Sequence, residues 1–276
     1  MPPRTTLFAW AAPAFTSGSP VDHTWITNFD NRAKHYPTIA DVVAAHKDYW
    51  FCWGSYHANG GTPADPTGFL GKQTGDLGLA RCLVLSNADS RSVAAARGAI
   101  FVYGVDGVCH QLANQVLYAT SDSGSPLTVS AARGYFASAF LYGTYGLEHA
   151  AWAAKMQVCA VSPPREGISG APKMPGLKDD FVERAQSVLG AGDQETLAKL
   201  LALKAEVHAF VAQKAPGFEP PDAETLNARN QHLIDQAAKL LGPDKFKAVF
   251  GFPAETGISL VDPTIARSGG APRKGR

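Results

Sequence analysis

Cys109 is the residue whose type and position point most directly to chemistry. It follows a glycine-broken turn, residues 103–108 (YGVDGV), and stands on the first turn of a predicted helix that runs to about Tyr118. The start of a helix carries unpaired N–H groups and a partial positive charge. That field favours thiolate over thiol, so a cysteine placed there is primed as a nucleophile. The alternative is an inert buried thiol, which is common in apolar surroundings.

A thiol nucleophile needs a base, usually an imidazole, within hydrogen-bond reach. His23 lies among β-branched and aromatic residues that predict a strand, which would fix the direction of its ring. His149, later in the chain than Cys109, is the second candidate for the base. His57 follows a strand-like run and could orient the base imidazole instead. We therefore predict catalytic roles for Cys109, His23, His149 and His57, and prefer His23 as the base.

Other polar residues near these candidates have weaker claims. Asp22, Asn28 and Asp30 are rivals of His57 for the orienting role. His110 adjoins Cys109, but successive helical residues are about 100° apart around the axis. The two side chains therefore cannot readily face each other, and we expect His110 to be structural or to form a wall of the site.

The first 160 residues mix short strands with helices. Without regular alternation of strand and helix, this pattern predicts an α+β fold with an antiparallel sheet and a helix that carries Cys109. A long polar loop is expected at residues 57–78, which are rich in glycine. The predicted strands are Leu7–Ala12, His23–Phe29, Tyr49–Tyr56, Arg81–Leu85 and Tyr135–Tyr142, and the further helices are Ile39–Lys47 and Asp89–Tyr103.

The second half is rich in Ala, Leu, Lys, Glu and Gln and predicts a small helical bundle. One apolar stripe runs from about Lys178 to Leu189, and a second begins near Asp193 and reaches Val211. A third begins at Asp222 and closes at Gly242-Pro243. We therefore divide the chain into an α+β domain at 1–160, a linker at 161–176, a helical bundle at 177–252 and an extended basic tail at 253–276.

Composition excludes several classes of function. The chain has 25 Lys and Arg against 24 Asp and Glu, so no global field attracts nucleic acid. The four cysteines form no CxxC pair or zinc-type cluster, and we predict neither a metal nor a cofactor. Reduced thiols are expected in a cytoplasmic compartment. No apolar run approaches the roughly 20 residues that a membrane span needs.

The segment Gly107-Val108-Cys109, leading into a helix with Ala113, resembles the nucleophile segment of papain-like and transglutaminase-like cysteine hydrolases. The resemblance implies that residues 1–160 form a papain-like catalytic domain, with a cysteine at a helix start, a histidine on a neighbouring strand and chemistry through a thioester. In the direct order His149-Ala150-Ala151-Trp152 would supply the base, although no Asp or Asn follows before Asp179. In the circularly permuted order, known in relatives of the NlpC/P60 cell-wall amidases, a strand histidine comes first. His23 followed by Cys109 fits that order, with His57 as the further polar residue.

The leading hypothesis is a cysteine-dependent hydrolase or acyltransferase that acts on an amide, isopeptide or ester. Its substrate would be a peptide, a cell-wall fragment or an acyl group. The alternative is a non-catalytic binding protein whose aromatic residues line a cleft for peptide or carbohydrate. The helical C-terminal region would either pack on the catalytic domain or mediate dimerisation.

Overall fold

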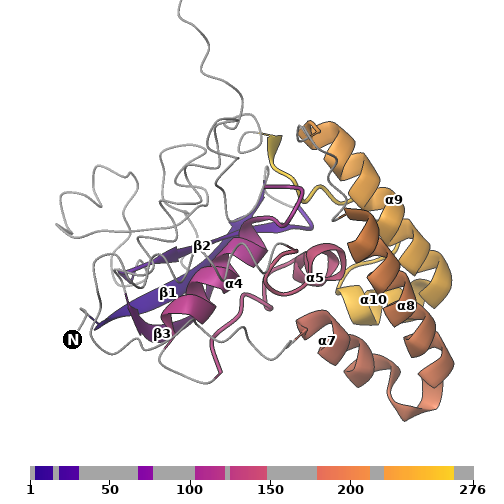
Figure 1. Cartoon of the computed structure of the whole chain (residues 1–276), viewed down its shortest axis with the longest axis horizontal. Coiled ribbons are helices and arrows are strands. Elements are labelled where there is room, and N and C mark those ends of the chain that lie inside the picture. Colours follow the sequence, from indigo (N-terminus) through magenta and orange to yellow (C-terminus); the bar gives the residue numbers. More distant parts are fainter. Residues whose placement is uncertain are drawn as a thin grey trace, which may run out of the picture.

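The computed structural model describes seven stretches of the chain, residues 4–14, 19–30, 68–76, 103–121, 125–147, 179–211 and 221–263. Within them the fold is α+β, as the sequence predicts, with an antiparallel sheet on one side and a group of helices on the other (Figure 1). The predictions for Tyr49–Tyr56, Arg81–Leu85, Ile39–Lys47 and the linker at 161–176 lie outside the described residues, as does most of Asp89–Tyr103.

Three strands form the described sheet in the order β2-β1-β3, and both pairings are antiparallel. The central strand β1 (Arg4–Pro13) pairs with β2 (Asp22–Thr27), where Ala12 lies opposite His23. Every residue of β2 is buried, so this strand belongs to the core over its whole length. The predicted strands at Leu7–Ala12 and His23–Phe29 are confirmed, the second ending two residues early.

The strand β3 (Phe69–Asp76) occupies part of the segment predicted as a polar loop. That prediction is wrong for residues 69–76, and the rest of the predicted loop lies outside the described residues. The segment contains Gly71 and Gly75 and lacks a clean apolar alternation, which is why its sequence is not typical of a strand. Its backbone pairing with β1, which extends from Arg4 to Trp10, provides the stability that its side chains do not.

The helix α4 (Cys109–Thr120) packs across β2 and β3. Its apolar residues Leu112, Ala113, Val116 and Leu117 are fully buried. Helical spacing places these four on the side that meets the sheet. The prediction of a helix that begins at Cys109 is therefore confirmed.

The helix α5 (Tyr135–Tyr142) corrects the prediction of a strand over the same residues. Its sequence, YFASAFLY, is buried on nearly all sides, and a short continuous apolar run does not reveal its period. It contains no Val, Ile or Thr, and Gly134 and Gly143 flank it with positive φ angles of 75° and 74°. Both glycines adopt backbone conformations that other residues rarely reach, and they delimit the helix.

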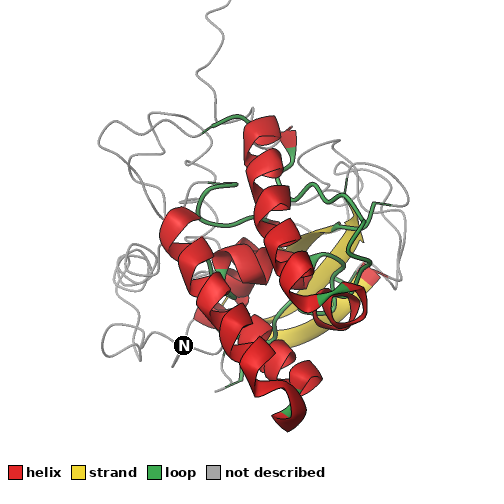
Figure 2. Ribbon diagram, turned by 90° about the vertical axis from the view of Figure 1, so that its right-hand side faces the viewer, coloured by secondary structure: helices red, strands yellow, loops and turns green. Residues whose placement is uncertain are grey.

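The helical region comprises α7 (Asp180–Leu189), α8 (Gln194–Val211), α9 (Ala223–Leu241) and α10 (Pro243–Phe250), with a short 3₁₀ turn, η4 (Ala191–Asp193), between the first two. All four helices contact α5, and Figure 2 shows the helices in front of the sheet. The predicted bundle is thus present, with α10 as a helix that the apolar stripes did not indicate. Because α5 comes from the first half, one hydrophobic core joins the predicted catalytic domain to the bundle.

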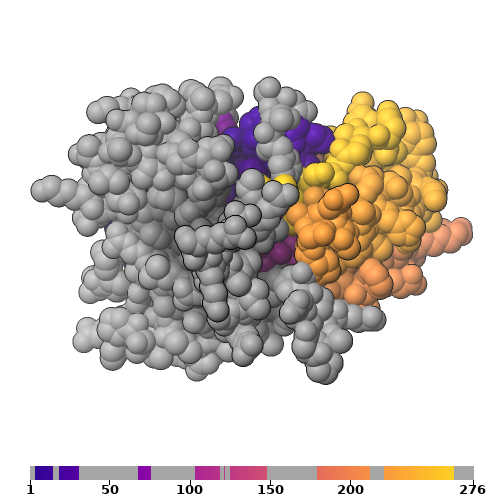
Figure 3. Space-filling view, turned by 90° about the horizontal axis from the view of Figure 1, so that it is seen from above, coloured from indigo at the N-terminus to yellow at the C-terminus, as the bar shows by residue number. Residues whose placement is uncertain are grey.

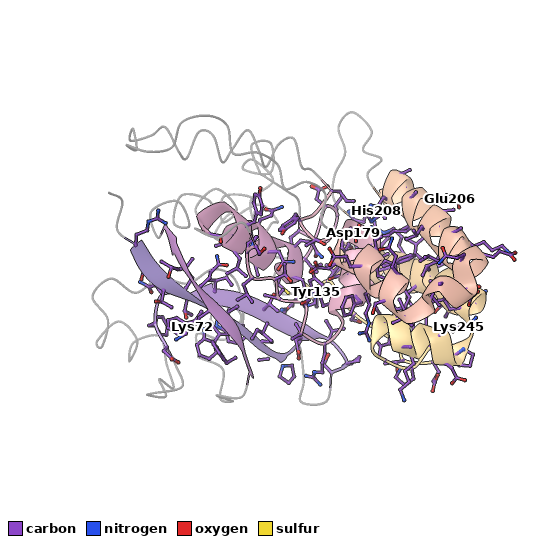
Figure 4. All side chains as sticks on the ribbon, turned by 90° about the horizontal axis from the view of Figure 1, so that it is seen from below. Lys72, Tyr135, Asp179, Glu206, His208 and Lys245 are labelled. Carbon is purple, nitrogen blue, oxygen red and sulfur yellow. The ribbon has the colours of Figure 1, made fainter. Side chains whose placement is uncertain are left out.

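Polar contacts reinforce this junction. The Asp179 carboxylate caps α7 by accepting from the N–H groups of Phe181 and Val182 at 3.1 and 3.2 Å, and it accepts from Lys204 Nζ at 2.6 Å. His208 contacts the Phe140 carbonyl of α5 at 2.9 Å. Asp179 and His208 lie close together where α7 and α8 meet α5 (Figure 4).

The chain after α10 folds back toward the sheet. We expected an extended tail from residue 253, but Ile258, Leu260 and Val261 are buried against the rest of the molecule. Figure 3 shows this C-terminal segment, in yellow, beside the N-terminal strands, in indigo. Residues 264–276 lie outside the described residues. The described part of the supposed tail is therefore a structural element that reaches the sheet.

Candidate active site

His23 lies on β2, the strand against which α4 packs. Its ring is buried, with 6 % of the residue exposed, and Nε2 lies 2.7 Å from Oδ2 of Asp262. Asp262 is 4 % exposed and belongs to the C-terminal segment. A buried ion pair with hydrogen-bond geometry fixes both groups, because neither can exchange its partner for water.

Cys109 is the first residue of α4 and lies beside the same strand. Its Sγ is 3.9 Å from the backbone carbonyl of Asp22, the residue before His23, and the Cys109 side chain is close enough to His23 to interact with its ring electrostatically. The Val108 N–H at the N-cap donates to Gln111 Oε1 at 3.1 Å, which holds the first turn in place. The sulfur thus sits at the positive end of a helix, next to a buried imidazole.

The turn before Cys109 packs directly on the segment that carries Asp262. The Gly104 N–H donates to the Gly107 carbonyl at 2.7 Å, and Gly104 has a φ of 82°. A Cβ at Gly104 would lie 2.8 Å from Val261 Cγ1, so only glycine fits there. The Asp262 N–H donates to the Tyr103 hydroxyl at 3.2 Å. The turn before Cys109 and the segment that carries Asp262 therefore hold each other in place.

The charge state of His23 follows from these neighbours. Burial lowers the pKa of His23, but the interactions of the ring with the Asp262 and Cys109 side chains outweigh burial and raise the pKa from 6.5 to about 10. The ring is therefore an imidazolium at neutral pH. The charged ring binds the Asp262 carboxylate and interacts with the Cys109 side chain beside it. Burial and the Cys109 charge in turn raise the pKa of Tyr103 well above 10, so its hydroxyl stays protonated.

His110 has a different role, as its position on the helix predicts. It is fully buried, with Nδ1 2.8 Å from Ser138 Oγ and Nε2 2.9 Å from the Asp22 carbonyl. Burial, opposed by the hydrogen bond to Asp22 and aided by the His23 charge, lowers the pKa of His110 to about 4. His110 is therefore a neutral structural link between α4, β2 and α5.

The structure brings two of the four predicted catalytic residues together, Cys109 and His23. His57 and His149 lie outside the described residues. Of the rivals for the orienting role, Asp22 is bound by Arg133, whose Nε and Nη2 lie 2.9 and 2.6 Å from Asp22 Oδ1. The group bound to the His23 ring is Asp262, which sequence reasoning missed. Leu260, Val261 and Asp262 are buried in succession, so the sequence around Asp262 has no regular period that could have marked it.

The aromatic residues that could have lined a binding cleft are mostly core residues where the structure describes them. Trp25, Tyr103, Tyr135, Tyr142 and Tyr145 are all buried. Tyr135 donates its hydroxyl to Asp180 at 2.8 Å and accepts from Asn114 at 2.9 Å, so it links α4, α5 and α7 (Figure 4). These rings contribute packing and internal hydrogen bonds.

Comparisons with known proteins gave no match, whether with family models, with curated proteins or with solved structures. Among the described residues, no group of three His, Cys, Asp or Glu side chains is arranged to hold a metal ion. No described helix is both long enough and apolar enough to cross a bilayer.

Proposed function

We propose that this chain is a thiol hydrolase or acyltransferase in which Cys109 is the nucleophile, His23 shuttles the proton and Asp262 orients His23. The observation that carries the proposal is the 2.7 Å bond between His23 Nε2 and Asp262 Oδ2, beside a cysteine at a helix start. A nucleophile, a base and a group that orients the base are the parts that covalent acyl transfer needs.

The geometry divides the roles of the two ring nitrogens. Asp262 binds Nε2, so proton exchange with Cys109 and the substrate runs through Nδ1. The Cys109 thiolate attacks the carbonyl carbon of an amide, isopeptide or ester, and the carbonyl electron pair moves onto oxygen. The first-turn N–H groups of α4, including that of Cys109, would donate to this oxyanion.

The intermediate then collapses and the bond to the leaving group breaks. His23 gives its Nδ1 proton to the departing amine or alcohol, which leaves a thioester on Cys109 and a neutral imidazole. Water or an amine attacks the thioester, and His23 takes the proton of that nucleophile. Expulsion of the thiolate restores the starting pair and releases a carboxylic acid or a new amide. The substrate class is a peptide, a cell-wall fragment or an acyl group.

The order of the residues supports the permuted arrangement that the sequence resembles. The strand histidine precedes the helix cysteine, whereas the carboxylate, Asp262, comes from a later segment than the predicted His57. A reducing compartment such as the cytoplasm keeps the thiol in its active form. Cys109 itself is 3 % exposed, so small acyl donors suit a first test.

The experiment uses p-nitrophenyl acetate, a small activated ester. We expect release of p-nitrophenol together with one acetyl group on the protein, located at Cys109 by peptide mapping. Cys109→Ala should abolish both signals. The matched control is the triple variant Cys52→Ala, Cys82→Ala and Cys159→Ala, which keeps Cys109 and should retain them. Equal acetylation of all four cysteines, or none at Cys109, would overturn the proposal.

A further inference from the structure

Asp262 is carried by a segment that belongs to none of the described helices or strands. Residues 258–262 run past α9 toward the sheet (Figure 1). Val261, just before Asp262, is fully buried, as are Ile258 and Leu260 to within a few per cent. Buried backbone N–H and C=O groups need hydrogen-bond partners, because water cannot serve them there. Protein groups must therefore fix the course of this segment.

Asn227 on α9 supplies two of these partners. Its Nδ2 donates to the Val261 carbonyl at 2.9 Å, and its Oδ1 accepts from the Val261 N–H at 2.9 Å. One side-chain amide thus pairs with both backbone groups of one residue, as a neighbouring strand would. One helical turn later, Gln231 accepts from the Ile258 N–H at 2.8 Å. Both side chains hydrogen-bond to the same segment, but Asn227 does so at Val261, the residue next to Asp262, and Gln231 does so at Ile258.

We infer that Asn227 is a positioning residue for the catalytic group, because it fixes the backbone of Val261 and thereby aims the next carboxylate at His23. This inference rests on the proposed function. From the other side, Val261 packs on Gly104, and Tyr103 accepts from the Asp262 N–H. Val261 is therefore held between α9 and the turn before Cys109, and Asn227 makes two hydrogen bonds from α9 to the Val261 backbone.

Loss of the two hydrogen bonds from Asn227 should turn the Asp262 carboxylate away from His23. A hydrogen bond weakens steeply as its angle departs from linearity, and small displacements of catalytic groups reduce rates disproportionately. Asn227→Ala should lower the titration midpoint of His23 by about one pH unit and slow acetylation of Cys109 by about tenfold. Gln231→Ala removes a hydrogen bond from the same segment at Ile258. It should leave the His23 midpoint unchanged and the acetylation rate within about twofold.

The test uses the full chain with isotope-labelled histidine. NMR follows the His23 titration, intact mass follows acetylation by p-nitrophenyl acetate, and urea unfolding measures the stability of each variant. A merely structural Asn227 would lower stability as Gln231 does and leave the His23 midpoint unchanged. That result would overturn the inference and leave the proposed function intact.

The Asp262→Asn background separates the two claims. If Asn227 acts through Asp262, then Asn227→Ala should change neither the midpoint nor the acetylation rate once the carboxylate is gone. An undiminished effect of Asn227→Ala in that background would overturn the inference. If Asp262→Asn alone leaves the His23 midpoint and the acetylation rate at their original values, the proposed function fails, and the positioning role fails with it.

Discussion

The surroundings of His23 and of His110 differ in the charge of the neighbouring groups, although both imidazoles are buried at β2. His23 belongs to that strand, and His110 binds it through the Asp22 carbonyl. His23 faces the Asp262 carboxylate and the Cys109 side chain, and its pKa is raised to about 10 although burial alone would lower it. His110 faces the Ser138 hydroxyl and the Asp22 carbonyl, and burial lowers its pKa to about 4. A charged partner reverses the sign of the pKa shift that burial causes, whereas neutral partners do not.

This contrast separates His23, the proposed catalytic ring, from His110, a structural one. In the proposed mechanism the His23 imidazolium supplies a proton to the leaving group, and the Asp262 carboxylate stabilises its charged form before that step. The neutral ring of His110 uses both nitrogens to connect Asp22 to Ser138. The following predictions exchange or weaken these partners and ask whether activity and stability respond separately.

Replacement of His23 should have the largest effect on activity. His23→Gln removes the proton shuttle and the positive charge beside the sulfur, so acetylation of Cys109 by p-nitrophenyl acetate should fall by roughly 10³-fold. The matched variant His110→Gln removes the other buried imidazole and should keep the rate within about tenfold. Intact mass spectrometry at neutral pH measures both. A His23→Gln protein that is acetylated as fast as the original chain would contradict the proposed role of His23.

The dependence of stability on pH should have opposite signs for the two histidines. The folded-state pKa of His110, about 4, lies below its unfolded value of 6.5, so its contribution is present above pH 6.5 and lost as the pH falls toward 4. The folded-state pKa of His23, about 10, lies above 6.5, so its contribution is present below pH 6.5 and lost as the pH rises toward 10.

Urea unfolding across this pH range measures the two contributions. The free-energy difference between the original chain and His110→Gln should shrink by on the order of 3 kcal/mol from pH 7 to pH 4. The corresponding difference for His23→Gln should shrink from pH 6 toward pH 10. Comparing differences removes the titration of all other groups. Parallel curves for the two variants would show that the two rings do not differ in charge.

The sequence predicts the part of this site whose residues carry local signals. A glycine-broken turn before an apolar-periodic segment placed Cys109 at a helix start, and β-branched neighbours placed His23 on a strand. Asp262 carried no comparable signal, because it lies in an irregular segment whose position depends on α9 and on the turn at Gly104. Such tertiary contacts between distant parts of a chain have no periodicity to detect.

The sequence likewise predicts some elements of the fold and misses others. The long amphipathic stripes of α8 and α9 were readable because each spans several turns with one apolar face. The short helix α5 was not, because burial on nearly all sides removes the contrast between faces. That error also hid the connection between the two halves, since α5 is the element around which the other helices pack.

The smallest effect should come from Arg133, which neutralises Asp22 beside His110. Its side chain is about half exposed (47 %), so the ion pair with Asp22 contributes about 1 kcal/mol or less. The Asp22 charge favours protonated His110. Arg133→Gln should therefore raise the pKa of His110 slightly and reduce its loss of stability toward pH 4. The acetylation rate should not change, because the described hydrogen bonds of the Arg133 side chain go to Asp22 and not to His23 or Asp262. A tenfold fall in that rate would show that the two surroundings are coupled through Asp22.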